Sequence, residues 1–192
     1  MFDSNIPFEF VKRESHDENH IHTEYYRFNL SSKFERSTKG HMRYTVQVEQ
    51  FLDGFYVIKF YSTTTRRSKN KFNILTHQYL AAPILETVMK IALEIYSKDN
   101  NASFGFVGER IITGTEEESV SNTKRFRLYK KLVQNFFPGK KVFKHYQNIE
   151  KSAYVIVNNC HSNHGEYASR LMGVLEELYP EFTSVSLTEI GS

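Results

Sequence analysis

The segment Asn122-Thr-Lys-Arg-Phe-Arg-Leu-Tyr-Lys-Lys-Leu132 decides the fold, because its apolar side chains recur at the period of a helix. Upstream lies the apolar stretch Ser103–Val107, which is typical of a buried strand. An apolar strand followed by an amphipathic helix is a building unit of α/β domains. The predicted helix carries its apolar stripe on Phe126, Tyr129, Leu132, Val133 and Phe136, and it stops before Pro138 and Gly139.

The first half of the chain alternates apolar and polar residues, a pattern that predicts strands with one face on a core. The strongest examples are Arg43–Glu49 and Phe55–Tyr61. Between them, Leu52-Asp-Gly54 predicts a hairpin turn in which Gly54 takes positive φ, so the two strands should pair antiparallel. Further strands are predicted at Phe8–Lys12, Glu24–Leu30 and Lys71–Thr76.

After Leu80 the hydrophobic period becomes 3.6 residues and predicts a helix over Ala81–Tyr96. The C-terminal part returns to strands and then to a helix. The predicted elements there are a hairpin of Val142–Tyr146 with Ala153–Val157, and a last helix over Glu166–Tyr179.

This order of elements predicts the fold class. We expect a single α/β domain with a mixed, mainly antiparallel sheet flanked by helices. The helix that contains Val88 should cover one face of the sheet, and the helix that contains Phe126 should cover the other. The domain should span residues 1–192, with N-terminal strands in 1–42 and a C-terminal helical extension over 160–192.

Composition limits the classes to which the chain can belong. At 192 residues it suits one domain with its own core, and 24% charged residues with 12 Tyr and 16 Phe exclude disorder of the whole chain. The single Cys160 cannot form an internal disulfide and the N-terminal residues lack a secretory signal, so we expect a reducing, cytoplasmic setting. No apolar run approaches the roughly 20 residues that span a bilayer, so no membrane partner is expected. The net charge of +3 is too small to indicate nucleic acid by itself.

The opening segment resembles one motif of the GNAT superfamily of acyl-CoA-dependent N-acyltransferases. In that motif an Asn opens the penultimate helix and a Leu-Tyr pair follows six and seven residues later, as Asn122, Leu128 and Tyr129 do here. The predicted order of elements is also similar to that of the GNAT fold, over residues 43–157. The resemblance implies transfer of an acyl group from acetyl-CoA or another acyl-CoA to an amine on a small molecule or a protein.

The same resemblance implies roles for particular residues. The phenol of Tyr129 would be catalytic, protonating the departing thiolate as a general acid. Asn122 would lie near the pantetheine arm of the cofactor, and backbone N–H groups of a splayed strand around Leu75 and His77 would stabilise the oxyanion. The residues by themselves leave alternatives open. Asn122 can be a helix N-cap and Tyr129 a core aromatic, and Thr115-x-x-Glu118 is a capping box that would start the helix earlier.

The loop that holds the cofactor pyrophosphate in GNAT enzymes has the pattern Gln/Arg-x-x-Gly-x-Gly/Ala before a long helix. The corresponding stretch here runs from Gln78 to Pro83, and both glycines are replaced. Ala81 adds a Cβ where the backbone approaches the phosphate, and Pro83 has no N–H to donate. The alternative is that Pro83 only starts a helix, since proline is favoured in the first turn.

Basic side chains gather on the opening segment. Lys124, Arg127 and Lys131 share one face of the predicted helix because they are three and four residues apart. That face could bind the phosphates of coenzyme A or of a nucleic acid, or it could be only the solvated side of the helix. Because the glycine loop is altered, coenzyme A binding should be weak and should depend on Lys124, Arg125 or Arg127.

Two stretches combine histidines with other residue types that bind metals, namely His16-x-x-x-His20-x-His22 and Cys160-His-x-x-His164. Neither has a second half at a recognised spacing, so no metal is expected. We interpret both groups as solvated loop histidines.

Two functions remain for comparison. The first is an N-acyltransferase that uses an acyl-CoA. The second is a non-catalytic GNAT-like module that binds nucleic acid or a protein partner through its basic surface. A pocket able to accept coenzyme A separates them, because a pure binding module should have filled that space with side chains such as Tyr79 and Pro83.

Overall fold

The structure is a computed structural model that describes residues 6–17, 19–30, 42–68, 71–72, 81–110, 112–113, 116–137, 141–179 and 188–189. Of residues 112–113, 116–117 and 188–189 only the backbone is described.

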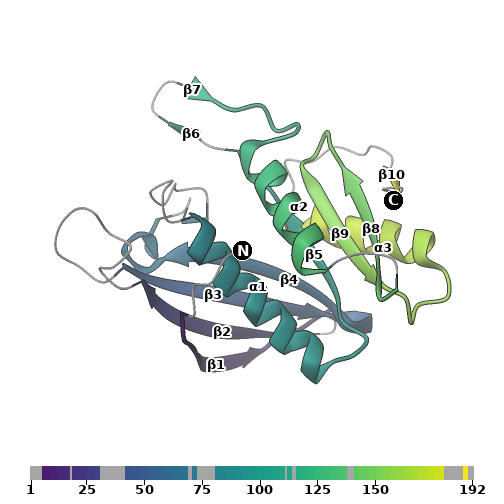
Figure 1. The fold of residues 1–192 in the computed structure, drawn as a ribbon, viewed down its shortest axis with the longest axis horizontal. Coiled ribbons are helices and arrows are strands. Elements are labelled where there is room, and N and C mark those ends of the chain that lie inside the picture. Colours follow the sequence, from purple (N-terminus) through teal and green to yellow (C-terminus); the bar gives the residue numbers. More distant parts are fainter. Residues whose placement is uncertain are drawn as a thin grey trace.

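One mixed sheet organises the described part of the chain (Figure 1). Its strand order is β1-β2-β3-β4-β5-β9-β8, with the two-residue strand β10 added beside β8. Only β4 and β5 pair in parallel, and the other neighbours in this sheet pair antiparallel. The strands are β1 Phe8–Ser15, β2 His20–Leu30, β3 Met42–Phe51, β4 Phe55–Ser62, β5 Ser103–Val107, β8 Phe143–Asn148, β9 Ala153–Asn158 and β10 Thr188–Glu189. A separate ribbon pairs β6 Ile112–Thr113 with β7 Glu116–Glu117.

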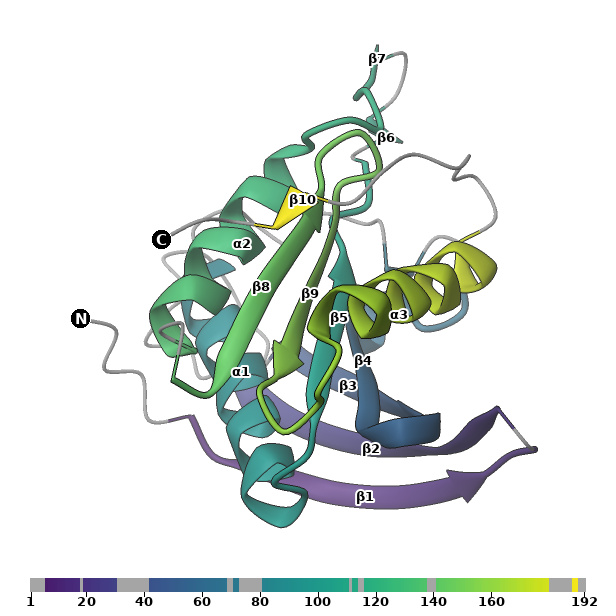
Figure 2. The same cartoon turned by 90° about the vertical axis from the view of Figure 1, so that its right-hand side faces the viewer.

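In the described part of the chain three α-helices pack on the sheet, α1 Ala81–Lys98, α2 Lys124–Phe136 and α3 His164–Leu178. The apolar sides of α1 and α2 share one core with the inward side chains of the sheet, among them Tyr26 and Tyr154. Helix α3 covers the opposite face, over Phe55 and Val155 (Figure 2). The predicted fold class, a single α/β domain with a mixed, mainly antiparallel sheet flanked by helices, is confirmed.

The expectation that α1 and α2 lie on opposite faces is wrong, because both lie on the same face. Helix α1 connects β4 to the parallel strand β5. Helix α2 connects β5 to β8, and these two strands also run parallel because each pairs antiparallel with β9. Both connections step across the sheet in the same direction. Right-handed crossovers that step the same way put their helices on the same face.

The predicted hairpin of β3 and β4 is confirmed. Phe51 pairs with Phe55 at its closed end, and the antiparallel register continues to Tyr44 opposite Ser62. The connecting turn has φ of 60° at Asp53 and 72° at Gly54. Glycine takes this left-handed region at no steric cost and aspartate more readily than most residues, so the turn fits its sequence.

The strand predicted over Lys71–Thr76 is wrong at its start. Lys71 and Phe72 lie in a turn, and residues 73–76 are outside the described residues. The Lys71 ammonium lies 4.5 Å from the centre of the Tyr61 ring, so this segment folds back onto the end of β4. Among the described strands, β4 is therefore the one that leads into α1.

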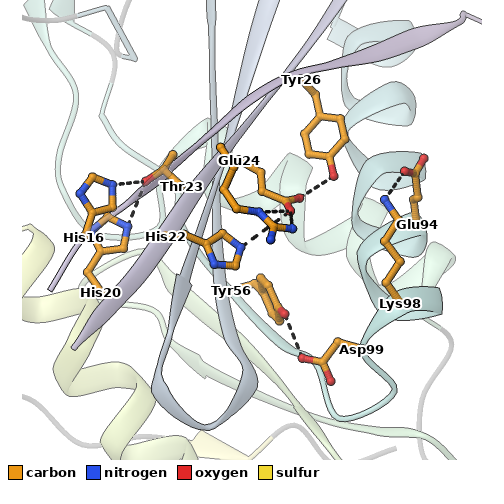
Figure 3. A network of polar contacts seen from close by, with 11 residues as sticks. His16, His20, His22, Thr23, Glu24, Tyr26, Tyr56, Glu94, Lys98 and Asp99 are labelled. Carbon is orange, nitrogen blue, oxygen red and sulfur yellow. Dashed lines mark hydrogen bonds and ion pairs between the residues drawn. The ribbon is translucent and has the colours of Figure 1, made fainter. Parts of the chain in front are cut away.

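A buried carboxylate links the first two strands (Figure 3). Glu24 of β2 is 6% exposed and accepts hydrogen bonds from the Tyr26 hydroxyl at 2.6 Å and from Arg13 Nε of β1 at 3.1 Å. His22 Nε2 lies 3.7 Å from the same carboxylate. Burial by itself would raise the pKa of Glu24, but the hydrogen bonds from Tyr26 and Arg13 outweigh it and leave the pKa lowered. Every partner of this carboxylate stabilises its charged form. We therefore interpret Glu24 as part of a structural ion pair between β1 and β2.

His20 and His22 lie in β2 and are partly buried, so their interpretation as solvated loop residues is wrong, whereas His16 is exposed in the turn before β2 as expected. His16 and His20 each place Nε2 3.0 Å from the Thr23 hydroxyl oxygen, and their rings stack 4.1 Å apart (Figure 3). His20 also stacks on Phe51 at 4.8 Å. Burial, followed by the nearby His16, lowers the pKa of His20. The packing therefore favours the neutral imidazole.

We expect the free energy of unfolding to fall as the pH drops below 6.5, the ordinary pKa of histidine. Burial lowers the pKa of His20, His22, His145 and His161, so the unfolded chain takes up protons there before the folded chain does. A second loss should begin below 4.5, because the lowered pKa of Glu24 keeps it ionised in the folded chain.

Thermal unfolding across this pH range measures both losses, and a His20→Gln variant should show a smaller first loss because it cannot titrate. A melting temperature that stays constant from about pH 8 to about pH 5 would contradict the prediction.

Candidate functional site

Strands β4 and β5 part from one another along their length. Their parallel ladder begins with Phe55 opposite Ser103 and ends with Val57 opposite Gly105. Beyond that point β4 stays paired with β3 and β5 stays paired with β9, each to its last residues. Each strand is thus held by its outer neighbour, which leaves the two inner edges unpaired with one another.

A cavity opens between these inner edges. Its volume is about 80 Å³. A single water needs roughly 10–15 Å³, so the cavity has room for an organic group. Most of the lining is apolar or aromatic. It includes Ile58 and Phe60 of β4, Phe104 and Phe106 of β5, Leu85, Val88, Met89 and Ala92 of α1, and Leu132 and Val133 of α2.

The cavity reaches both faces of the sheet. Phe106 packs against the core that α1 and α2 share, whereas Val107 belongs to the core under α3. On the α3 side, the Lys59 ammonium lies 5.2 Å from the centre of the Tyr179 ring, and both residues line the cavity. Lys59 also pairs with Glu49 at 2.8 Å. The lining therefore includes residues from both faces of the sheet.

Tyr129 of α2 faces the gap. The centre of its ring lies 6.1 Å from that of Phe60 on β4 and 5.6 Å from that of Phe106 on β5. Burial raises the pKa of Tyr129 to about 12, with Arg125 opposing this shift and Glu109 adding to it. Among the described residues, none forms a hydrogen bond with the Tyr129 hydroxyl. The phenol therefore stays protonated at neutral pH and can donate its proton to a bound molecule.

Among the described residues of the lining, Arg125 and Glu109 are the charged ones that act on the Tyr129 phenol. Arg125 lies one helical turn earlier, and its Nη1 donates a hydrogen bond to the Phe72 carbonyl at 2.7 Å. Glu109 lies two residues after β5, and its charge acts on both Tyr129 and Tyr179. Glu109 was not predicted from the sequence. The signal was its place just past the carboxyl end of a parallel strand, where open α/β sheets bind their ligands.

The Tyr154 hydroxyl, in the wall of the cavity, is already satisfied. His145 Nε2 lies 3.1 Å from the Phe137 carbonyl, which can only accept, so this nitrogen carries the proton. The other ring nitrogen, Nδ1, then accepts from the Tyr154 hydroxyl at 2.9 Å. Burial lowers the pKa of His145, which agrees with a neutral ring. Tyr154 and His145 thus shape the wall without presenting a free polar group to the cavity.

Helix α2 begins at Lys124 with Thr123 as its N-cap, and the Thr123 hydroxyl accepts the Phe126 N–H at 3.0 Å. The alternative in which Asn122 is the N-cap is therefore wrong. The alternative in which the capping box ending at Glu118 starts the helix is also wrong. Instead, the Glu118 carboxylate accepts the backbone N–H of Lys124 at 2.7 Å.

Asn122 and Arg127 do not line the cavity. Asn122 adopts a φ of 52°, and its N–H donates to the Ile149 carbonyl at 2.9 Å. Arg127 is exposed, and its guanidinium donates to the Asn122 carbonyl. The structure thus brings these two predicted cofactor-binding residues together, but on the outside of α2.

The predicted cofactor loop is described only in part. Leu75, His77 and Gln78 lie outside the described residues, and Ala81 is the first residue of α1. Pro83 lies in the first turn of α1, as the helix-start alternative expected. The Thr87 hydroxyl donates a hydrogen bond to the Pro83 carbonyl at 2.8 Å.

Gly108 lets α2 start directly against the end of β5. Its carbonyl accepts the Thr123 hydroxyl. A Cβ built on Gly108 would lie 2.3 Å from the backbone nitrogen of Phe126, a distance that real atoms do not adopt. This contact holds the first turn of α2, and with it Arg125 and Tyr129, against the gap.

The second histidine group, before α3, is also partly packed, so its interpretation as solvated is wrong. The His161 ring stacks on Tyr167 at 3.8 Å, and the Nε2 atoms of His161 and His164 are buried. Cys160 is exposed. Within the described ranges, no three His, Cys, Asp or Glu side chains form a group that could hold a metal ion.

No protein-family model, curated protein or solved structure matches the chain. Across the described parts of the chain, no helix combines the length and the apolar character needed to cross a membrane. What the gap between β4 and β5 can do therefore follows from its own geometry and chemistry.

Proposed function

We propose that the protein is an N-acyltransferase of the GNAT type, which transfers an acyl group from an acyl-CoA thioester to an amine. The observation that carries the proposal is the parting of the parallel strands β4 and β5 around a cavity that Tyr129 faces. A strand splayed from its neighbour is where the GNAT resemblance puts the reacting thioester. The Tyr129 phenol is protonated at neutral pH, so it holds a proton that a departing thiolate can take, while burial, which raises its pKa, makes it a weaker acid than a solvent-exposed tyrosine.

In this proposal the amine nitrogen attacks the thioester carbonyl, so that a C–N bond forms and the C–S bond breaks. Glu109 accepts the proton that the amine loses, and the Tyr129 hydroxyl gives a proton to the sulfur. Backbone N–H groups on the unpaired edge of β4 beyond Val57 stabilise the oxyanion, in place of the donors expected near Leu75 and His77. Exchange with solvent then removes the proton from Glu109 and returns one to Tyr129.

The phosphates of coenzyme A would lie near the N-terminal ends of α1 and α2, where backbone N–H groups favour anions. Arg125, in the first turn of α2, is the cation that this end offers to the cavity. Because the glycines of the phosphate loop are replaced, Arg125 should contribute a large share of the binding of coenzyme A.

Arg125→Glu should raise the Kd for coenzyme A by about tenfold or more, because a charge-assisted contact becomes a repulsion. Arg127→Glu makes the same change of charge two residues away, outside the cavity lining, and should change the Kd by less than about threefold. Isothermal titration of both variants measures the difference, and melting without ligand checks that each is folded. Equal losses in the two variants would show that only the overall charge of α2 matters.

A second function is favoured by the exposed basic stripe on α2. Lys124, Arg127 and Lys131 are all exposed and follow one another along the helix surface. In this alternative the module binds nucleic acid or a protein partner through the stripe, and the gap has no catalytic role. Nucleic acid binding that weakens steeply with salt and is lost on reversing these charges would support it.

The test of the proposed function combines two measurements on the wild-type protein. Isothermal titration with coenzyme A measures binding, and a thiol-release assay with an acyl-CoA and a panel of amines measures transfer. Thiol release that requires an amine supports the transferase. Binding without amine-dependent release, or no binding, would overturn it and leave the basic module as the better explanation.

A further inference from the structure

The cavity continues past Tyr129 between the sheet and the two helices that cover it. Helix α1 lines it down to Ala92, and α2 with its C-cap lines it down to Phe137. The two helices end close together, because Tyr96 of α1 and Phe137 both contact the Phe143 ring, at 5.2 and 5.3 Å between centres. The cavity therefore runs along both helices toward their C-terminal ends.

The lining becomes apolar along this direction. Arg125, Glu109 and the Tyr129 hydroxyl lie toward the N-terminal end of α2. Among the described residues that line the cavity beyond Tyr129 on this face, only Tyr154 carries a hydroxyl, and that hydroxyl is bonded to His145. The other residues there are apolar, among them Val88, Met89, Ala92, Leu132, Val133 and Ile156.

The apolar part has the length of an extended chain and a closed end. Tyr129 and Phe137 are eight residues apart, which corresponds to about 12 Å at roughly 1.5 Å per helical residue. At the far end the Phe137 ring packs on Phe104, with 5.6 Å between centres. An octanoyl chain is of comparable length.

We infer that the acyl donor carries a medium-length, unbranched apolar chain, such as octanoyl, which fills the cavity beyond Tyr129. The inference rests on the proposed acyl-CoA function and adds the class of acyl group to it. An acetyl group is too short to contact the apolar walls of the cavity beyond Tyr129. Each methylene moved from water onto such walls strengthens binding by a factor of about four. With the thioester at Tyr129, the chain also points away from Arg125 and Glu109.

The test is a chain-length series on the full chain, with coenzyme A and its acetyl, butanoyl, octanoyl and dodecanoyl thioesters. Isothermal titration below the micellar concentrations gives each Kd. We expect the affinity to rise by about 10²-fold or more from acetyl to octanoyl. It should stop rising at dodecanoyl, because Phe137 and Phe104 close the end.

Variants on α1 test where the chain lies. Ala92→Leu fills the far end and should move the preferred chain length down, whereas Met89→Ala enlarges the cavity and should move it up. Leu93→Ala is the matched control, because Leu93 is exposed on the same helix and does not line the cavity. The wild-type series needs no variant, so a variant that fails to fold does not remove the test.

Two results would contradict the inference, and they differ in what they say about the proposed transferase. Equal affinities for the acetyl and octanoyl thioesters in the wild type would overturn the inference and leave the proposed transferase intact. Absence of binding by every ligand in the series, coenzyme A included, would overturn the proposed function and the inference together.

Discussion

Tyr129→Phe is expected to lower the rate of thiol release from acyl-CoA by about 10²-fold or more, the usual scale for loss of a general acid. The substitution removes only the hydroxyl, and the ring keeps its contacts with Phe60 and Phe106. None of the described residues hydrogen-bonds to that hydroxyl, so the free energy of unfolding should change by no more than about 0.5 kcal/mol. The thiol-release assay measures the first effect and thermal unfolding the second.

Tyr96→Phe is the matched control for this prediction. Tyr96 is a partly buried tyrosine of α1 that packs on Phe143 and does not line the cavity. Its loss of a hydroxyl should leave thiol release unchanged. If the wild type and Tyr129→Phe release thiol equally, or if neither releases any, the acyltransferase is ruled out.

Gly108→Ala is expected to destabilise the fold by about 3 kcal/mol or more, at the upper end of the cost of overpacking. The new Cβ would lie 2.3 Å from the Phe126 nitrogen and 2.4 Å from its Cα. Both are backbone atoms in the first turn of α2, so no side chain can rotate away to make room. Either the start of α2 moves off β5 or the strand end shifts.

The melting temperature measures this loss, which should be about 6–12 °C for a chain of this size. Gly173→Ala is the control, because Gly173 lies inside α3 and a Cβ there meets no atom within 4 Å. That variant should keep or slightly raise the stability, since alanine favours a helix over glycine by roughly 0.5–1 kcal/mol. Equal melting temperatures for the two variants would show that α2 can shift freely, and its contact with Gly108 would not fix the site.

Elements governed by one local rule were predicted well. Strand β5 spans Ser103–Val107 as predicted, because a short apolar run between turn residues has few other structures available. The hairpin turn before Phe55 and the first residue of α1, Ala81, also follow local rules of turn chemistry and periodicity. The prediction failed at Lys71, where a polar residue packs on the Tyr61 ring and no alternating pattern decides the backbone.

Of the cavity residues that were given a function from the sequence, Tyr129 and Arg125 lie in the lining, and both stand on one predicted helix, which is a local property. Glu109, Lys59 and Tyr179 reach the same cavity from the end of β5, the middle of β4 and the residue after α3. No spacing in the sequence links them, because their meeting depends on how three distant segments pack. His20 was misjudged for the same reason, since its polar neighbours in sequence gave no sign that its ring stacks on Phe51.

By itself, the sequence determined the α/β class, the order of the main strands and helices apart from the segment at Lys71, and the presence of Tyr129 on a packed helix face, because periodicity acts within each segment. Only the tertiary structure decided that α1 and α2 share a face and that β4 and β5 part beyond Val57 and Gly105. Both depend on which strands are neighbours. Because β9 lies between β5 and β8, both crossovers step the same way, and outer partners hold β4 and β5 on either side of the gap.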